Sequence, residues 1–160
     1  MLFRIFIIIT FGVDRRHRIE AMLEDLRSRG LRITPQRVAI VHLFAGDPSH
    51  PTAQELFERL QPKFPAMSFA TVYNTLDALA GAGLSRTLRL GPAARFDPNT
   101  EPHHHAVCDS CGRIVDVPAK DQHADPPAKR SVRAAAPGFA VTRVEHIYRG
   151  LCARCAEAES

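Results

Sequence analysis

The stretch Ser68-Phe69-Ala70-Thr71-Val72-Tyr73-Asn74-Thr75-Leu76-Asp77-Ala78-Leu79 is the part of this 160-residue chain that decides its fold. It begins with a serine, a residue that favours the cap of a helix, and glycines follow at positions 81 and 83. Three apolar residues share one helical face: Val72, Leu76 and Leu79. Polar side chains that suit phosphates and base edges lie largely outside this face: Thr71, Tyr73, Asn74 and Asp77. We therefore predict a helix with an exposed polar face.

Other helices and a hairpin are predicted around this segment. Patterns of apolar residues predict helices over residues 16–29, 35–44 and 53–61. The second and third have suitable capping residues in Thr34 and Thr52. Residues 84–97 alternate weakly in hydropathy about a Gly-Pro turn, which predicts a short hairpin. This order is typical of a winged helix-turn-helix domain, although a helical bundle with no role in DNA binding fits it too.

The basic charge of the chain is confined to its first part. The whole chain has 21 Lys and Arg against 17 Asp and Glu, a formal net charge of +4. Residues 1–90 hold 12 basic and 8 acidic residues, whereas residues 91–160 hold 9 of each. The excess therefore coincides with the predicted winged helix and favours DNA as its partner. The candidate DNA contacts are Arg32, Arg37, Ser68, Thr71, Tyr73 and Asn74.

The character of the sequence changes after residue 97. We predict strands over residues 106–107, 114–117 and 139–148, and a short helix over residues 129–136. The expected fold class is therefore α+β, with a winged-helix domain over residues 14–92 and a small α/β domain over residues 93–160. Residues 1–13 are expected to be a disordered tail or to follow from a wrongly assigned start codon. So small a second domain needs a metal or a partner subunit to fold.

All four cysteines belong to this second domain and form two Cys-x-x-Cys pairs. The pairs are Cys108 with Cys111 and Cys152 with Cys155. Two such pairs predict a structural zinc site, while a redox dithiol is the alternative interpretation. The apolar run over residues 2–10 is a poor export signal and is too short to span a membrane, so we expect a cytoplasmic protein without disulfides.

A second group of possible metal ligands surrounds three consecutive histidines. In a strand, His103 and His105 point to one side and His104 points to the other. Two aspartates and one further histidine complete the group: Asp97, Asp116 and His50. Imidazole and carboxylate donors suit Fe²⁺, Mn²⁺ or Zn²⁺ better than Cu⁺. Ordinary surface histidines are the alternative.

Over nearly all of residues 20–156 the chain resembles the ferric uptake regulator family. The matching segments are residues 30–37, 50–52, 70–76, 95–97, 103–112, 114–116 and 150–155. Family members are dimeric, metal-dependent transcriptional repressors with an N-terminal winged helix and a C-terminal dimerisation domain. The resemblance thus implies a homodimer that binds double-stranded operator DNA, with no membrane association and no substrate other than a metal ion and, in one branch, H₂O₂.

The resemblance also implies a regulatory ligand set and a branch of the family. The ligands would be His50, Asp97, His103, His105 and Asp116, so that Fe²⁺ or Mn²⁺ fixes the orientation of the two domains. Asp97, Asp116 and Asn74 resemble the peroxide-sensing branch, in which iron and H₂O₂ oxidise a ligand histidine, here His50 or His103. Iron-responsive or zinc-responsive repression is the alternative.

Three histidines remain outside this implied set. His123 and His146 are expected to be surface or structural residues, and His104 is a candidate for an auxiliary metal site. A non-haem iron enzyme that uses two histidines and a carboxylate is a remote alternative. We expect no enzyme, because the sequence offers no further acid, base or cofactor motif.

Overall fold

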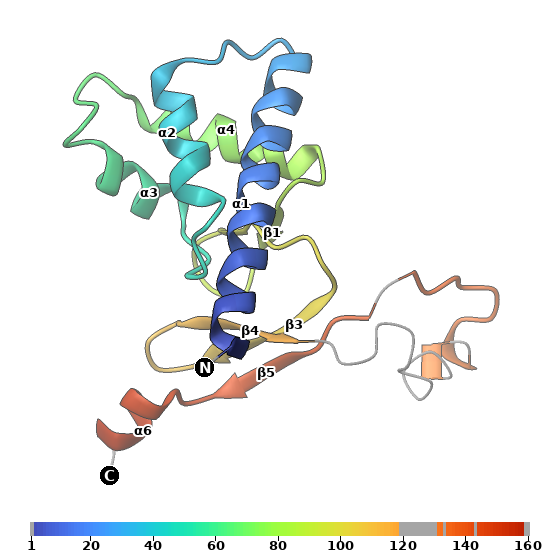
Figure 1. The fold of residues 1–160 in the computed structure, drawn as a ribbon. Helices are drawn as coiled ribbons and strands as arrows, with labels where there is room; N and C mark the ends of the chain where they lie inside the picture. Colours follow the sequence, from blue (N-terminus) through green and yellow to red (C-terminus); the bar gives the residue numbers. More distant parts are fainter. Residues whose placement is uncertain (1, 119–130, 133, 143, 159–160) are drawn as a thin grey trace. The chain divides into compact units, whose positions relative to one another are not determined.

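The computed structural model describes residues 2–118, 131–132, 134–142 and 144–158, with side chains from Arg15 onward. The chain divides into two compact units, residues 1–100 and 101–160 (Figure 1). The first unit contains four helices and a hairpin, and the second contains a three-stranded sheet and a short helix. The α+β class and the winged-helix order of the first unit are therefore confirmed. No helix among the described residues is long and apolar enough to cross a membrane.

The helices of the first unit are α1 (Leu2–Ser28), α2 (Pro35–Phe44), α3 (Ala53–Leu60) and α4 (Phe69–Gly81). Their starts follow the predicted capping residues. The hydroxyl of Thr34 accepts the backbone N–H of Arg37 at 3.3 Å, and the hydroxyl of Ser68 accepts that of Thr71 at 3.2 Å. Thr52 begins α3 with a complete capping box. Each cap satisfies backbone N–H groups that a helix start leaves without intrahelical partners.

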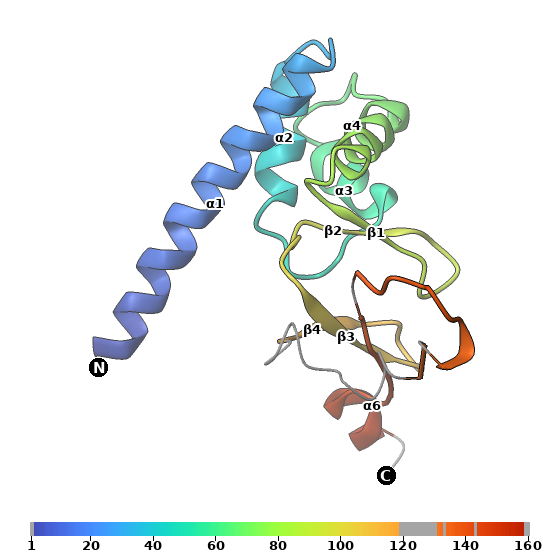
Figure 2. The ribbon, with the colours of Figure 1, turned by 90° about the vertical axis from the view of Figure 1, so that its right-hand side faces the viewer.

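Helix α4 packs against each of the other three helices of this unit (Figure 2). The side chains that fill the space between the helices are fully buried: Met22, Leu26, Ile40, Val41, Phe44, Leu56, Val72, Leu76 and Leu79. Burial of one such side chain contributes about 1.5 to 3 kcal/mol. The apolar face predicted for residues 68–79 is therefore the face that anchors α4.

Helix α1 is longer than the amphipathic pattern predicts. It begins at Leu2 instead of residue 16, so residues 2–13 are helical as well. The first proline of the chain is Pro35, so no residue before it removes a backbone N–H from the helix.

The hairpin consists of β1 (Arg86–Leu88) and β2 (Arg95–Asp97), which pair antiparallel. Strand β2 also contacts the segment before α3, because Arg95 forms an isolated bridge with Thr52 and the N–H of Phe96 donates to the carbonyl of Pro51 at 2.9 Å. These contacts place residues 93–100 in the first unit, so the boundary lies after Thr100 and not after residue 92.

The sheet of the second unit has the order β4-β3-β5. Strand β3 (His103–Cys108) pairs antiparallel with β4 (Ile114–Pro118) and parallel with β5 (Ile147–Gly150). Helix α6 (Ala153–Ala158) follows. The prediction of a strand over residues 139–148 is wrong for most of that range, since pairing with β3 begins only at Ile147. Of the helix predicted over residues 129–136, residues 131, 132, 134 and 135 are helical, and residues 129, 130 and 133 lie outside the described part.

Candidate functional site

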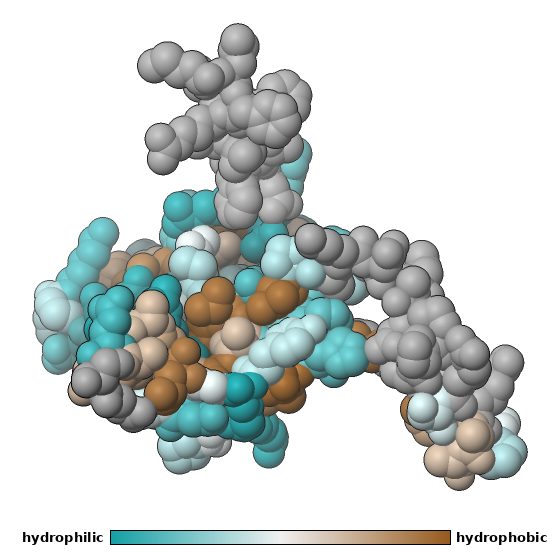
Figure 3. Space-filling model, turned by 90° about the horizontal axis from the view of Figure 1, so that it is seen from below, coloured by the Kyte–Doolittle hydropathy of each residue, from teal (hydrophilic) through white to brown (hydrophobic). Residues whose placement is uncertain are grey.

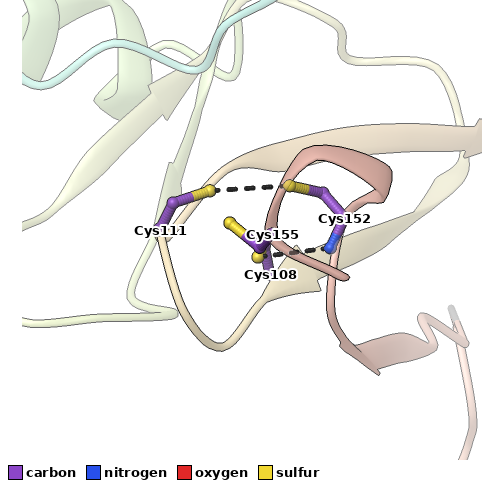
Figure 4. Close-up of side chains that lie close together, drawn as sticks. All are labelled: Cys108, Cys111, Cys152 and Cys155. Carbon is purple, nitrogen blue, oxygen red and sulfur yellow. Dashed lines mark hydrogen bonds between the residues drawn. The ribbon is translucent and has the colours of Figure 1, made fainter. Parts of the chain in front are cut away.

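The four cysteines converge at one end of the sheet in the second unit (Figure 4). Their sulfur atoms all lie within 4.8 Å of one another, and the Sγ atoms of Cys111 and Cys152 are 3.8 Å apart. None of the four forms a disulfide. Four thiolates around one zinc ion with bonds of about 2.3 Å have sulfur–sulfur separations of about 3.8 Å. The donor set and its spacing therefore fit a tetrahedral zinc ion.

Sheet register brings the two pairs together. Cys108 ends β3 opposite Gly150 of β5, and the N–H of Asp109 donates to the carbonyl of Gly150 at 2.8 Å. The first pair is closed by a tight turn in which the N–H of Gly112 donates to the carbonyl of Cys108 at 2.9 Å. Gly112 has a φ of +70°, a left-handed conformation that glycine adopts without a steric penalty.

Backbone donors favour the thiolate form of the first pair. The N–H groups of Cys111 and Cys152 lower the pKa of Cys108 to about 6, and the N–H of Arg113 lowers the pKa of Cys111. A hydrogen bond with Ser110 lowers the pKa of Cys155, but hydrogen bonds with the neighbouring sulfurs outweigh it and raise that pKa to about 11. Four neighbouring thiols do not all ionise together, because their thiolates repel one another. A cation bound between them would favour their charged forms.

The second candidate group lies on β3 and β4 of the same unit. His103 and His105 point to one side of β3, and their Nε2 atoms are 2.9 Å apart. Asp116 lies opposite His105 on β4, and one of its carboxylate oxygens is 3.5 Å from His103 Nε2 and 4.0 Å from His105 Nε2. This geometry confirms the alternation that the sequence predicts for the histidines. Of the five implied ligands, the second unit thus brings three together.

Outer hydrogen bonds orient both imidazoles. His103 Nδ1 lies 2.7 Å from the carbonyl oxygen of Glu101, and His105 Nδ1 lies 2.8 Å from Oε1 of Glu145. A carbonyl and an ionised carboxylate only accept hydrogen bonds, so each imidazole, in its neutral form, would carry its proton on Nδ1. In that tautomer the two Nε2 lone pairs, 2.9 Å apart, would face each other. A cation held by both Nε2 atoms would remove this repulsion, and the 2.9 Å separation suits two nitrogen ligands of one ion.

The remaining two implied ligands meet inside the first unit. His50 Nε2 lies 3.8 Å from Oδ1 of Asp97, the last residue of β2. His50 has a φ of +53°, in the left-handed region that is uncommon for a residue other than glycine. The guanidinium of Arg95 donates to the carbonyl of His50 at 3.0 Å and to Glu55 at 3.3 Å. Contacts with β2 therefore hold the backbone of His50.

Asp47 organises the loop that carries His50. Its carboxylate accepts the N–H of Ser49 at 2.9 Å, the hydroxyl of Ser49 and a guanidinium N–H of Arg59. Burial alone would raise the pKa of Asp47, but the hydrogen bonds with Ser49 and Arg59 lower it below its ordinary value. The charged carboxylate therefore stabilises this loop.

The predicted DNA contacts differ in how free their polar atoms are. Tyr73 and Asn74 are exposed on α4, and Arg32 is exposed before α2. Ser68 and Thr71 share a hydrogen bond of 2.9 Å between their hydroxyls as part of the helix cap. Arg37 is half-buried and donates to the carbonyl of Arg32 at 2.6 Å. Of the predicted DNA contacts at the start of α4 and within it, Tyr73 and Asn74 are thus the exposed ones whose polar atoms take no part in the helix cap.

His104 lies on the opposite side of β3 from His103 and His105. Its ring packs against His146 with centroids 4.7 Å apart, and the backbone N–H of His146 donates to its Nδ1 at 3.2 Å. His146 is therefore a structural neighbour of His104. His123 lies outside the described residues.

Sequence reasoning missed two residues that support the histidines, Arg95 and Glu145. Arg95 belongs to a segment that the sequence analysis singles out, but its contact with His50 depends on how the loop lies against β2. Glu145 is two residues before Ile147, which pairs with His105. Side chains two residues apart in an extended segment lie on the same face, so Glu145 lies on the face of His105. The sequence does not show this, because it depends on the parallel register of the two strands.

Comparison with known proteins decides the family. The sequence profile of the ferric uptake regulator family matches residues 28–145. The chain belongs to the ferric uptake regulator family. It is 39% identical over 147 residues to the peroxide operon regulator of Bacillus subtilis, an alignment that covers 90% of this chain and 97% of that protein. It is 46% identical over 101 residues to the peroxide-responsive repressor PerR of Staphylococcus epidermidis, covering 62% of this chain and 67% of that protein.

A solved structure agrees with this assignment at the level of the fold. The ferric uptake regulator Fur of Helicobacter pylori superimposes with a TM-score of 0.67 at 22% identity, covering 89% of this chain and 96% of that one. The match to the family profile confirms the resemblance inferred from the sequence motifs. The two sequence relatives named above are both peroxide regulators.

Proposed function

We propose that this member of the ferric uptake regulator family is a dimeric, metal-dependent transcriptional repressor that responds to peroxide. The observation that carries the proposal is the 39% identity to the peroxide operon regulator of Bacillus subtilis across 97% of that protein. An alignment of this extent includes both units of the chain. The relatives are regulators, and we assign no enzymatic role to this protein.

The cysteine cluster would hold a structural Zn²⁺ ion. Its four thiols meet in the geometry that such an ion requires, and the lowered pKa values of Cys108 and Cys111 favour two of the thiolates. The ion would join the end of β3 to the start of α6. Structural zinc contributes on the order of 10 kcal/mol to the folding of small domains.

The regulatory Fe²⁺ or Mn²⁺ ion would be held by His50 and Asp97 from the first unit and by His103, His105 and Asp116 from the second. Each unit already positions its own share of these donors through the contacts described above. Ligands from both units would fix one relative orientation of the winged helix. When bound, Fe²⁺ would activate H₂O₂ by a one-electron exchange that leaves no net change in the iron. The imidazole of His50 or His103 would take one oxygen atom from H₂O₂ and the other would leave as water, after which the oxidised ring is a poorer ligand.

Operator binding would use the exposed face of α4 in each subunit of a dimer. Tyr73 and Asn74 face solvent there, and the basic excess of the chain lies in the same unit. Dimerisation would use the second unit, which exposes several large apolar side chains: Val115, Phe139, Ile147, Tyr148 and Leu151. Hydrophobic side chains gather over part of the face seen in Figure 3. Apolar surface of this kind is typical of an interface between subunits.

Operator affinity measured with each metal, before and after peroxide, tests the proposal. Zinc-loaded protein is supplied with Fe²⁺ or Mn²⁺ at one fixed salt concentration. Its binding to the DNA upstream of its own gene is followed by gel shift. We expect both ions to support binding, and peroxide to abolish it only with Fe²⁺. Mass spectrometry should then find one added oxygen atom on the peptide with His50 or His103. Unmodified histidines together with persistent binding after peroxide would contradict the proposal.

A further inference from the structure

The carboxylate of Glu145 lies beside the ring of His105, one of the proposed metal ligands. Its Oε1 atom is 2.8 Å from Nδ1 of His105, whose side chain is fully buried. The side chain of Glu145 itself is 27% exposed. The parallel pairing of β5 with β3 sets this contact, since the carbonyl of His146 accepts the N–H of His105 at 3.1 Å. Glu145 is thus tied to the same stretch of β3 as the ligand it touches.

The two ring partners on β3 differ in charge. His103 has a neutral backbone carbonyl beside its Nδ1, whereas His105 has a carboxylate. A carboxylate accepts a stronger hydrogen bond than a neutral oxygen, and it increases the electron density that the opposite ring nitrogen donates. The two histidines would therefore bind a metal ion unequally, with His105 the stronger ligand.

The other neutral tautomer of His105 would block the site to a metal ion. If the proton of His105 moved from Nδ1 to Nε2, it would be donated to Nε2 of His103, which is only 2.9 Å away. Both lone pairs that a metal ion needs would then be occupied by one internal N–H···N hydrogen bond. The carboxylate of Glu145 opposes this closure, because it holds the proton on Nδ1.

We infer that Glu145 is a positioning residue of the regulatory metal centre, which keeps His105 in the Nδ1-protonated tautomer and so leaves both Nε2 atoms available to a divalent cation. This inference rests on the proposed function, since it concerns the same ligand set. Glu145 does not itself bind the ion. Its effect is on the affinity of the site and on the state of His105 before metal arrives.

The test compares Glu145→Ala and Glu145→Gln with the unchanged protein, all loaded with zinc. Loss of an outer-shell partner of a ligand histidine lowers metal affinity by about 10-fold to 100-fold. We expect a loss of this size in Mn²⁺ affinity for Glu145→Ala and a smaller loss for Glu145→Gln, whose amide oxygen still accepts the Nδ1 proton. Glu157→Gln, an exposed residue of α6, is the matched control and should leave the affinity unchanged.

A spectroscopic measurement separates positioning from a structural effect. Nitrogen-15 NMR of the histidine rings in the protein without Mn²⁺ reports which nitrogen carries the proton. We expect His105 to change from the Nδ1-protonated to the Nε2-protonated form in Glu145→Ala, while the Nδ1 proton of His103 stays beside the carbonyl of Glu101. An unchanged tautomer of His105 with unchanged Mn²⁺ affinity in both variants would overturn the inference.

Failure of the proposed function would look different. If the unchanged protein bound no Mn²⁺, or if His105→Ala bound it as tightly as the unchanged protein, the regulatory site itself would be refuted. The isosteric Glu145→Gln variant keeps the test decisive if Glu145→Ala does not fold.

Discussion

His50 Nε2 lies 3.8 Å from Oδ1 of Asp97, although the two residues are far apart in the chain. Contacts of β2 with the segment before α3 create this proximity. The N–H of Phe96 donates to the carbonyl of Pro51, and the guanidinium of Arg95 donates to the carbonyl of His50. Residues that neighbour Asp97 and His50 in the chain therefore hold this half of the proposed ligand set in place.

Removal of the Arg95 side chain should weaken the regulatory site. Arg95→Ala loses the hydrogen bond to the carbonyl of His50 and the ion pair with Glu55, which joins Arg95 to the capping box of α3. The left-handed backbone of His50 then loses a partner that fixes it. We expect Mn²⁺ affinity to fall by about tenfold, as for other outer-shell partners, and the free energy of unfolding by about 1 kcal/mol. Titration with Mn²⁺ and denaturation by urea measure these two effects.

Arg89→Ala is the control for this prediction. Arg89 is an exposed arginine in the turn of the same hairpin, so its removal changes the net charge equally. Equal Mn²⁺ affinities for both variants would show that Arg95 acts only through charge and does not hold His50.

Asp47→Asn should destabilise the first unit in a pH-dependent manner. The pKa of Asp47 is below its ordinary value of 3.8 because Ser49 and Arg59 hydrogen-bond the charged form. A depressed pKa in the folded state stabilises the fold above the unfolded-state value, and that stability is lost as pH falls through the folded pKa. We expect Asp47→Asn to cost about 1 to 3 kcal/mol at pH 7, and the cost to shrink once the pH falls below 3.8.

Urea denaturation followed by far-ultraviolet circular dichroism measures this difference, because α1 to α4 contribute most of the helical signal. The exposed Asp77→Asn on α4 should change the midpoint by less than about 0.5 kcal/mol at neutral pH. A difference between Asp47→Asn and the unchanged protein that is constant from pH 7 to pH 3 would contradict the role of the charge.

Local sequence signals predicted much of the first unit. The caps at Thr34, Thr52 and Ser68 were predictable because a cap joins residues only three positions apart. The two cysteine pairs were equally predictable as zinc ligands, since the spacing typical of metal binding is local within each pair. For the same reason the alternation of His103 and His105 along one strand could be predicted.

Features that depend on pairing between distant segments were not predictable in this way. The boundary between the units lies after Thr100 because β2 pairs with β1 and touches the segment before α3. The last strand is shorter than its composition suggests, since its length is set by where β3 begins to pair with it. Glu145 reaches His105 only through that parallel register, which no local pattern encodes.

Removal of zinc should unfold the second unit while the first retains its helices. The sheet of the second unit buries few large side chains, and structural zinc is worth on the order of 10 kcal/mol to a domain of this kind. We expect a strong chelator, or the substitution Cys111→Ser, to abolish protection from hydrogen exchange in β3, β4 and β5 and to dissociate the proposed dimer. Addition of Zn²⁺ after chelation should restore both. A folded, metal-free Cys111→Ser protein with protected strands would refute the structural role of the ion.

Asn74→Ala should weaken operator binding without weakening the fold. Asn74 is exposed on α4, on the side away from the buried residues Val72 and Leu76, so its amide is available to a base edge. Loss of one good base contact costs about 1 to 3 kcal/mol, or about 5-fold to 150-fold in affinity. The salt dependence of operator binding by the variant should stay the same, since no phosphate contact is lost. Gln61→Ala, an exposed residue at the end of α3, is the control in the same unit. Equal affinity of Asn74→Ala and the unchanged protein for operator and unrelated DNA would exclude Asn74 from sequence recognition and leave Tyr73 as the exposed reader on that helix.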